Sequence, residues 1–172
     1  MRKFGLIPSH FWQSDSFSAM PIETKLTAVY LLSNHHSNIV HLYKLRAEYA
    51  AIDLGISTQQ YETAMVNLVK CDFCLHDSDN NVVWIRSAFI GDFGAEINPH
   101  DKRIIGLQNF EPQLPDSWIL DIFYHEFGKK FKLKSARFKK ALASPLASPH
   151  ARKIEDKGRT INVHRTFLIK RQ

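Results

Sequence analysis

The chain has 172 residues, of which 44% are hydrophobic and 12% aromatic, and its 23 Lys and Arg exceed its 17 Asp and Glu by a net charge of +6. This apolar content excludes wholesale disorder, and the length allows one domain or a small domain with an appended module. No run approaches the roughly 20 apolar residues that span a bilayer, and two cysteines three positions apart cannot form a disulfide framework. The first residues lack the apolar segment of a signal peptide, so we expect a soluble, cytoplasmic protein without membrane contact.

The charge is divided unevenly along the chain. Residues 1–128 hold nine Lys and Arg against 15 Asp and Glu, a net −6, whereas residues 129–172 hold 14 against two, a net +12. An acidic front followed by a strongly basic end indicates a protein that handles nucleic acid, because clustered cations attract phosphates. We therefore expect the C-terminal part to supply affinity for a polyanion.

The N-terminal residues predict an aromatic arm and a first helix. The stretch from Leu6 to Phe17 carries Phe11 and Trp12 among polar residues, and we expect both rings to lie on the core. Pro21 suits a first helical turn, where its missing N–H costs nothing. A helix from Ile22 to about Asn34 is predicted by apolar residues at helical spacing. These residues are Leu26, Val29, Tyr30 and Leu32.

A short strand within residues 38–45 and a helix from Leu45 to Leu54 come next, and Gly55 ends that helix. Ser57 begins another helix, which reaches about Lys70, and Gln60 three residues later completes a capping box. At about 100° per residue, the apolar and polar residues of this helix form opposite faces. The expected core face is Tyr61, Ala64, Met65 and Leu68; the expected outer face is Gln59, Thr63, Val66 and Lys70, with Asn67 at the flank.

A β-hairpin is predicted after Asp72. Two apolar runs, residues 73–76 and 82–85, flank the turn-forming residues 77–81. The order of elements is then helix, strand, helix, helix and hairpin, which is the order of a winged helix-turn-helix domain. We therefore predict an α+β fold in which residues 1–92 form such a domain.

The pattern weakens after Ile85, where Gly91, Gly94 and Pro99 mark a connection. We assign residues 93–115 to this connection, with a short helix at 101–110, and residues 116–172 to a basic, mostly helical region. Asp116 and Ser135 are expected to cap two helices of that region. Their apolar residues are Trp118, Ile119, Ile122, Phe123, Phe127, Phe131, Phe138 and Leu142. A Pro/Ser-rich linker at 144–149 and a terminal strand or hairpin beyond an Asp156-Lys157-Gly158 turn are also predicted; Ile161, Val163, Phe167 and Ile169 alternate there.

Three groups of residues in the first half point to a family. They are Phe11-Trp12 with Lys25, Tyr30-Leu31-Leu32 and Asn34; Gly55-Ile56-Ser57 with Tyr61, Ala64-Met65, Leu68 and Phe73; and Val83-Trp84-Ile85. Together they resemble the N-terminal winged-helix domain of phage replisome organisers and DnaD-like replication initiation proteins, over roughly residues 4–92. The resemblance implies binding to a replication origin, recruitment of a replicative helicase or its loader, and self-association as a homo-oligomer.

Two positions depart from that family. Asp72 stands where its members usually carry glycine, at the exit of the predicted recognition helix, and Asp is able to adopt the left-handed conformation needed there. The predicted hairpin tip, residues 77–81, contains Asp77 and Asp79, whereas a wing that grips phosphate is basic. Two carboxylates would repel a phosphate backbone, which leaves room for a hairpin that faces a protein.

The outer face of the Ser57 helix has the chemistry for reading a DNA major groove, because amides pair with adenine and lysine pairs with guanine or phosphate. The residues expected to contact DNA there are Gln59, Thr63, Asn67 and Lys70, with Lys44 and Arg46 as phosphate contacts. The alternative is that these side chains form only the solvated face of a surface helix.

Seven cations lie within twelve residues of the basic region and alternate with Phe131 and Phe138. They are Lys129, Lys130, Lys132, Lys134, Arg137, Lys139 and Lys140. Such a run favours DNA or RNA binding with a strong inverse dependence on salt. A membrane-surface helix or a solvated face that keeps the protein soluble are the alternatives.

Neither a metal nor a catalytic site is expected. Cys71 and Cys74 form a CxxC followed by His76, but a zinc site needs a fourth ligand, for which His35, His36 and His41 are the candidates. Cys74 falls at a strand position and no second CxxC is present, so we expect no metal and no cofactor. HExxH, GxSxG and Walker glycine motifs are absent from the sequence.

The resulting hypothesis is a non-catalytic DNA-binding protein, an initiator or organiser of phage or mobile-element replication in a bacterial cytoplasm. Two alternatives stay open. One is a winged-helix protein–protein module that self-associates or docks a helicase or its loader. The other is a sequence-specific transcriptional repressor.

Overall fold

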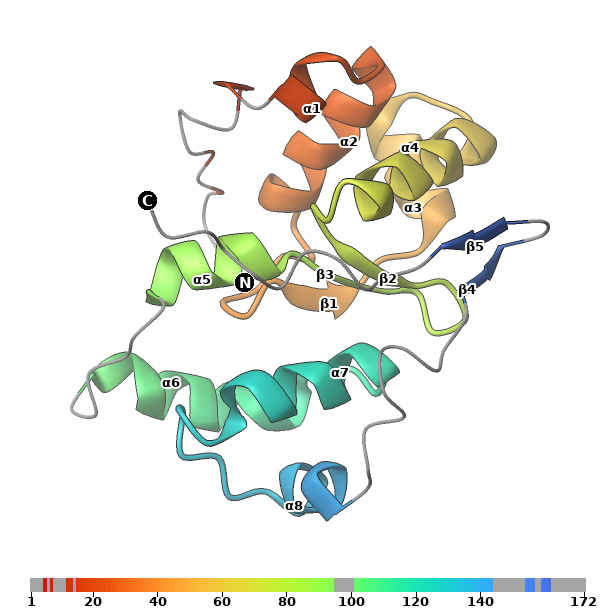
Figure 1. Ribbon diagram of the computed structural model, residues 1–172. Helices are drawn as coiled ribbons and strands as arrows, with labels where there is room; N and C mark the ends of the chain where they lie inside the picture. The colour runs from red at the N-terminus through yellow and green to blue at the C-terminus, as the bar shows by residue number, and fades with distance from the viewer. Residues whose placement is uncertain are drawn as a thin grey trace. The chain divides into compact units, whose positions relative to one another are not determined.

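The structure is a computed structural model that describes residues 5, 7, 12–13, 15–94, 101–143, 154–156 and 159–161. The chain divides into two compact units, residues 1–120 and 121–172, and each is described by itself. Figure 1 shows that short helices and a small antiparallel sheet make up the first unit. The fold is α+β, as predicted.

Within the first unit, the elements from α2 to β3 (residues 22–84) follow the predicted order of helix, strand, helix, helix and hairpin, and further helices precede and follow them. The elements of this unit are α1 (Asp15–Ser18), α2 (Ile22–Ser33), β1 (Leu42–Lys44), α3 (Ala47–Leu54), α4 (Thr58–Lys70), β2 (Leu75–Asp77), β3 (Val82–Trp84), α5 (Arg86–Phe93), α6 (Lys102–Phe110) and a 3₁₀ turn, η2 (Glu111–Gln113). Helix α7 (Trp118–Phe123) begins in this unit and ends in the second.

Helix α2 lies where predicted, but most of the residues that it buries are not the large apolar residues of the predicted pattern. Its buried residues are Thr24, Thr27, Ala28, Leu31 and Leu32. Ile22 and Leu26 are 71% and 45% exposed. The small side chains of this face let α2 pack against α4, and Thr24 accepts a hydrogen bond from the Asn67 amide of α4 at 3.3 Å. Of the apolar residues whose spacing predicted this helix, Leu32 is buried and Leu26 is exposed.

The aromatic arm is described only in part. Phe11 lies outside the described residues. Trp12 makes an edge-to-face contact with the buried ring of Phe17, with 5.6 Å between ring centroids, yet it remains 55% exposed. Trp12 therefore lies on the core as predicted but is not enclosed by it.

The ends of α3 and α4 confirm three local predictions. Gly55 directly after α3 and Asp72 after α4 are both left-handed, with φ of 67° and 57°. Ser57 caps α4, because its hydroxyl accepts the Gln60 N–H at 3.2 Å while the Gln60 side chain accepts the Ser57 N–H at 2.9 Å. This reciprocal pair satisfies N–H groups that would otherwise lack partners, and it fixes where α4 begins.

The sheet has the order β1-β3-β2, and both strand pairs are antiparallel. Tyr43 lies opposite Val83, and both pack in the core formed with α2, α3 and α4. Leu42 lies opposite Trp84 and, because side chains alternate along a strand, these two point to the other face. Both are completely buried. The sheet is therefore covered by protein on both faces, and neither face is open to water.

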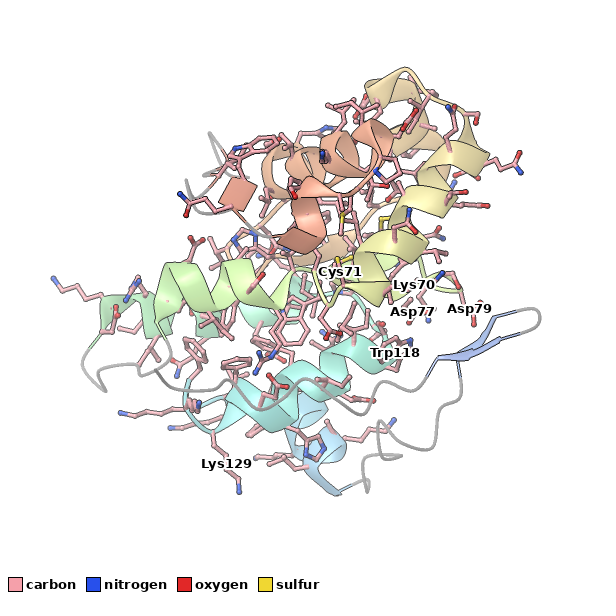
Figure 2. The ribbon with its side chains drawn as sticks, turned by 45° about the horizontal axis from the view of Figure 1, so that its top comes forward. Lys70, Cys71, Asp77, Asp79, Trp118 and Lys129 are labelled. Carbon is pink, nitrogen blue, oxygen red and sulfur yellow. The ribbon has the colours of Figure 1, made fainter. Side chains whose placement is uncertain are left out.

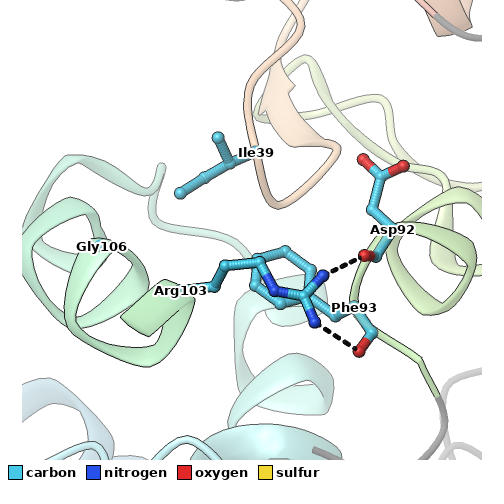
Figure 3. Close-up of a pocket in the computed structure, with 5 residues that line it drawn as sticks. All are labelled: Ile39, Asp92, Phe93, Arg103 and Gly106. Carbon is cyan, nitrogen blue, oxygen red and sulfur yellow. Dashed lines mark hydrogen bonds between the residues drawn. The ribbon is translucent and has the colours of Figure 1, made fainter. Parts of the chain in front are cut away.

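Helix α5 was not predicted and replaces part of the expected connection. Its residues Phe89 and Phe93 are buried. Figure 3 shows Arg103 of α6 reaching the end of α5, where it donates to the carbonyls of Asp92 at 2.6 Å and Phe93 at 3.5 Å. These carbonyls belong to the last turn, where helical partners are missing. An open depression of about 370 Å³ lies beside this contact.

The second unit contains a π-helical turn, η3 (Tyr124–Gly128), and helix α8 (Ala136–Ala143). Ser135 caps α8 as predicted, since its hydroxyl accepts the Phe138 N–H at 3.0 Å. The Phe138 ring packs so closely on Gly128 that a Cβ there would lie 2.2 Å from it. Strands β4 (Ile154–Asp156) and β5 (Arg159–Ile161) pair antiparallel, with Asp156 opposite Arg159.

Several expectations fall outside the described residues, namely the linker at 144–149 and the alternating apolar residues beyond Ile161. In the ranges that are described, no helix combines the length and the apolar character needed to cross a membrane.

Candidate nucleic-acid interface

Helix α4 is packed on one side and open on the other. Its four expected core residues are all buried. The four expected outer residues, Gln59, Thr63, Val66 and Lys70, are all exposed. An α-helix fits the width of a DNA major groove, so a helix with one free face can enter it without rearrangement of the core.

Two of the four expected base-reading groups on α4 already have partners within the fold. The Thr63 hydroxyl donates to the Gln59 carbonyl one turn earlier at 2.9 Å, and the Asn67 amide donates to Thr24. Thr63 is a residue that often bonds back to its own helix in this way. Gln59 and Lys70 are thus the better placed polar groups on this face, and Figure 2 shows Lys70 at its C-terminal end.

Lys44 and Arg46 lie on either side of the step from β1 to α3. Lys44 is the last residue of β1, Arg46 directly precedes α3, and both are exposed. The N-terminus of a helix carries partial positive charge, which adds to the attraction of Arg46 for phosphate. Glu48 in the first turn of α3 offsets part of that field.

The hairpin tip is less acidic at its surface than the sequence suggested. Asp77 is part of β2 and only 3% exposed. Its carboxylate accepts hydrogen bonds from the Ser117 hydroxyl at 2.5 Å and from the Asn80 amide at 2.9 Å. Figure 2 shows Asp77 close to Trp118, with Asp79 farther out. Of the two carboxylates expected at the tip, only Asp79 is exposed.

The ionisation of Asp77 follows from these contacts. Burial alone would raise the pKa of the Asp77 carboxyl, but hydrogen bonds from Ser117 and Asn80 outweigh burial and lower the pKa below its ordinary value. The ionised carboxylate is therefore an internal anchor of the hairpin. Asp77 is therefore not a surface carboxylate of the hairpin tip, in contrast to the expectation from the sequence.

The basic segment, residues 129–140, exposes its charges and buries its apolar residues. Six of the seven cations, all except the half-buried Arg137, are exposed. Four apolar residues between and after them are buried, namely Phe131, Leu133, Phe138 and Ala141, whereas Leu142 is 37% exposed. Lys130 Nζ lies 5.5 Å from the centre of the Phe127 ring. Burial of these apolar side chains thus anchors the backbone that carries the exposed cations of the second unit.

The two cysteines behave as apolar residues. Cys74 is fully buried, and burial raises the pKa of its thiol. The Cys71 thiol donates to the Leu68 carbonyl at 3.2 Å, and its pKa is likewise raised by burial. Over the described part of the chain, no cluster of three or more His, Cys, Asp or Glu side chains is placed to hold a metal ion.

One acid–histidine pair was not predicted. His41 Nε2 and Asp92 Oδ2 lie 3.0 Å apart, and the His41 side chain is 3% exposed. The pair joins the residue before β1 to the end of α5, and the His41 carbonyl also accepts the Ile85 N–H at 3.0 Å. These contacts hold α5 against the sheet. The sequence alone could not reveal the pair, because its two members lie 51 residues apart.

Comparison of the chain with protein-family models, with curated proteins and with solved structures finds no match to any of the three. The contacts and charges of the chain itself therefore carry the argument about its function.

Proposed function

We propose that this protein binds DNA without catalysing a reaction on it. In this proposal residues 1–92 act as a winged helix-turn-helix domain, with α4 as the recognition helix and β2–β3 as the wing. The basic segment supplies most of the affinity for phosphate. The resemblance of residues 4–92 to replisome organisers favours initiation of phage or mobile-element replication, with a helicase or its loader as partner, over transcriptional repression.

The basic segment is the observation that carries the proposal. Its exposed lysines are concentrated on one short stretch, while the two acidic residues of positions 121–143 are Asp121 and Glu126. Cations arranged in this way release counterions from DNA when they bind phosphates, which makes affinity high at low salt and steeply dependent on salt.

The arrangement of α3, α4 and the hairpin supports the same proposal. The capped helix α4, with its outer face exposed, follows the shorter helix α3, and the hairpin β2–β3 follows both along the chain. Of the two carboxylates of the hairpin, only Asp79 lies at the surface that a wing would present to DNA.

A protein-interaction module is the second candidate, and exposed apolar residues favour it. On α2 and α3, Ile22 is 71%, Ile52 75% and Tyr49 52% exposed. Side chains of this size at the surface are common at interfaces with other proteins. In that reading, DNA binding belongs to the basic segment alone.

The test is binding of the full chain to random-sequence duplex and single-stranded DNA over about 50 to 200 mM salt, followed by fluorescence anisotropy. The comparison variant replaces Lys129, Lys130, Lys134 and Lys139 by Gln. Lys132, whose backbone is left-handed with φ of 53°, is kept. Each lost phosphate contact should reduce the slope of log K against log salt by about 0.9 for duplex DNA.

Lys102→Gln, outside the basic segment, is the matched control for Lys134→Gln within it, because each variant removes one exposed lysine. Lys134→Gln should weaken binding to every sequence, whereas Lys102→Gln should not. No binding at low salt, or binding that is unchanged in the four-lysine variant, would contradict the proposal.

A further inference from the structure

The outer face of α4 carries two methyl-bearing side chains at its centre. Thr63 and Val66 are three residues apart and therefore neighbours on the helix surface. Both are exposed, and Val66 is apolar yet 38% exposed. Gln59 lies one turn before Thr63, and Lys70 one turn after Val66, so the pair is flanked by polar groups on both sides.

The hydrogen bonds decide what this pair offers to a ligand. The Thr63 hydroxyl donates to the Gln59 carbonyl at 2.9 Å. With its proton committed to its own helix, the Thr63 hydroxyl is left as an acceptor only, and the methyl group is the apolar part of Thr63 that can make an outside contact. Val66 has neither donor nor acceptor. The centre of the face is therefore mostly apolar, although the sequence presents it as a polar face with one valine.

In the major groove of DNA, one base carries an apolar group at its edge, and that group is the C5-methyl of thymine. An apolar contact with Thr63 and Val66 would leave the donors and acceptors of other base edges without partners. We propose that Thr63 and Val66 contact thymine methyl groups and make the protein prefer duplexes with thymine at the centre of the α4 footprint. This inference rests on the proposed function, because it requires α4 to enter the groove.

The experiment begins with selection of bound duplexes from a random-sequence library by the full-length protein. In the selected duplex, each thymine is then replaced in turn by deoxyuridine, which lacks only the C5-methyl group. Loss of one buried methyl contact should weaken binding about fourfold. We expect this loss at one or two neighbouring positions and no change at the others.

Two substitutions connect that loss to the two residues. Val66→Ala removes both γ-methyl groups and suits a helix well, and Thr63→Ser removes the methyl but keeps the hydroxyl that bonds to Gln59. In each variant, thymine and deoxyuridine should bind equally at one contacted position. Ile52→Ala is the matched control, because it trims an exposed apolar residue of α3 and should leave the thymine preference intact.

The outcomes separate the two proposals. Failure to bind duplex DNA would overturn the proposed function and this inference together. Two results would overturn this inference and leave the proposed function standing. One is duplex binding that is not weakened at any position when deoxyuridine replaces thymine. The other is that both α4 variants keep the wild-type preference for thymine over deoxyuridine.

Discussion

Three residues in left-handed backbone positions end helical segments with the same pair of hydrogen bonds. The left-handed residues are Gly55, Asp72 and Lys132, with φ of 67°, 57° and 53°. In each case the N–H of the left-handed residue and the N–H of the next residue donate to carbonyls of the preceding turn. At the first site Gly55 donates to Ile52 and Ile56 to Ala51; at the second Asp72 donates to Val69 and Phe73 to Leu68. At the third site Lys132 donates to Lys129 and Leu133 to Gly128. This is the Schellman arrangement, which glycine adopts without steric cost.

The first prediction compares Gly55 and Asp72. Asp72→Gly should raise the free energy of unfolding by up to about 1 kcal/mol, because it relieves the contact between Cβ and the backbone at positive φ. Gly55→Ala should lower it by about 1 kcal/mol for the same reason. Urea unfolding, followed by the fluorescence of buried Trp84, measures both changes. Equal stability of wild type and Asp72→Gly would mean that Asp72 makes a compensating local contact.

At the scale of elements, the hairpin β2–β3 is fastened at one end by a single buried carboxylate. The Ser117 hydroxyl donates to Asp77 and also accepts the Ile119 N–H of α7 at 3.2 Å. Ser117 therefore joins the end of β2 to the segment after α6, next to the predicted cap Asp116. The completely buried Leu42 and Trp84 lie on the sheet face that carries Asp77, because residues in register point the same way.

The second prediction is that Ser117→Ala destabilises the protein by about 1 to 3 kcal/mol at neutral pH, as expected for loss of a hydrogen bond to a buried charge. The pKa of Asp77 is depressed in the folded state, so its contribution is present above the ordinary value of 3.8 and is lost as pH falls through the folded pKa. The difference between wild type and variant should therefore be largest near neutrality and shrink below about pH 4.

Unfolding of both proteins by urea at a series of pH values makes this measurement. Ser87→Ala is a suitable control, because Ser87 is exposed in α5. A difference that does not vary with pH would show that Ser117 stabilises the start of α7 rather than the Asp77 carboxylate.

The elements differ in how well the sequence predicts them. Helix α4 was predicted closely because its capping box and four core residues obey one helical period. Helix α5 contains Gly91 and has only two buried residues, Phe89 and Phe93, so no period stands out. Its end depends on Arg103, which is ten residues away from Phe93 in the sequence. A helix stabilised by such tertiary contacts leaves little local signal.

The candidate site shows the same division between local and distant information. The spacing of residues along α4 identified its exposed face, since exposure follows from the helical period. It could not identify the Asn67 bond to Thr24 or the burial of Asp77 under Ser117, because each partner lies about 40 residues away or more. Charge and amide chemistry therefore overstated the polar groups on α4 and the acidity of the hairpin.

At the scale of the whole molecule, the two kinds of DNA contact that we propose fall in different units of the chain. The α4 face belongs to residues 1–120, which are acidic overall, and the basic segment belongs to residues 121–172. Base contacts specify a sequence, whereas phosphate contacts supply affinity that is largely independent of sequence. If the protein binds DNA as proposed, specificity belongs to the first unit and most of the affinity to the second.

The last prediction is that the two contributions can be removed separately. Gln59→Ala should reduce the preference for a selected duplex over random duplex by about 1 to 3 kcal/mol while leaving the salt dependence unchanged. The four-lysine variant should weaken binding to both duplexes equally and flatten the salt dependence. When the two sets of substitutions are combined, the losses for the selected duplex should add to within about 0.5 kcal/mol, as for independent sites.

If instead Gln59→Ala weakened both duplexes equally, α4 would not read bases, and the basic segment alone would bind DNA. A combined loss well below the sum would mean that the α4 contacts form only when the basic segment is already bound.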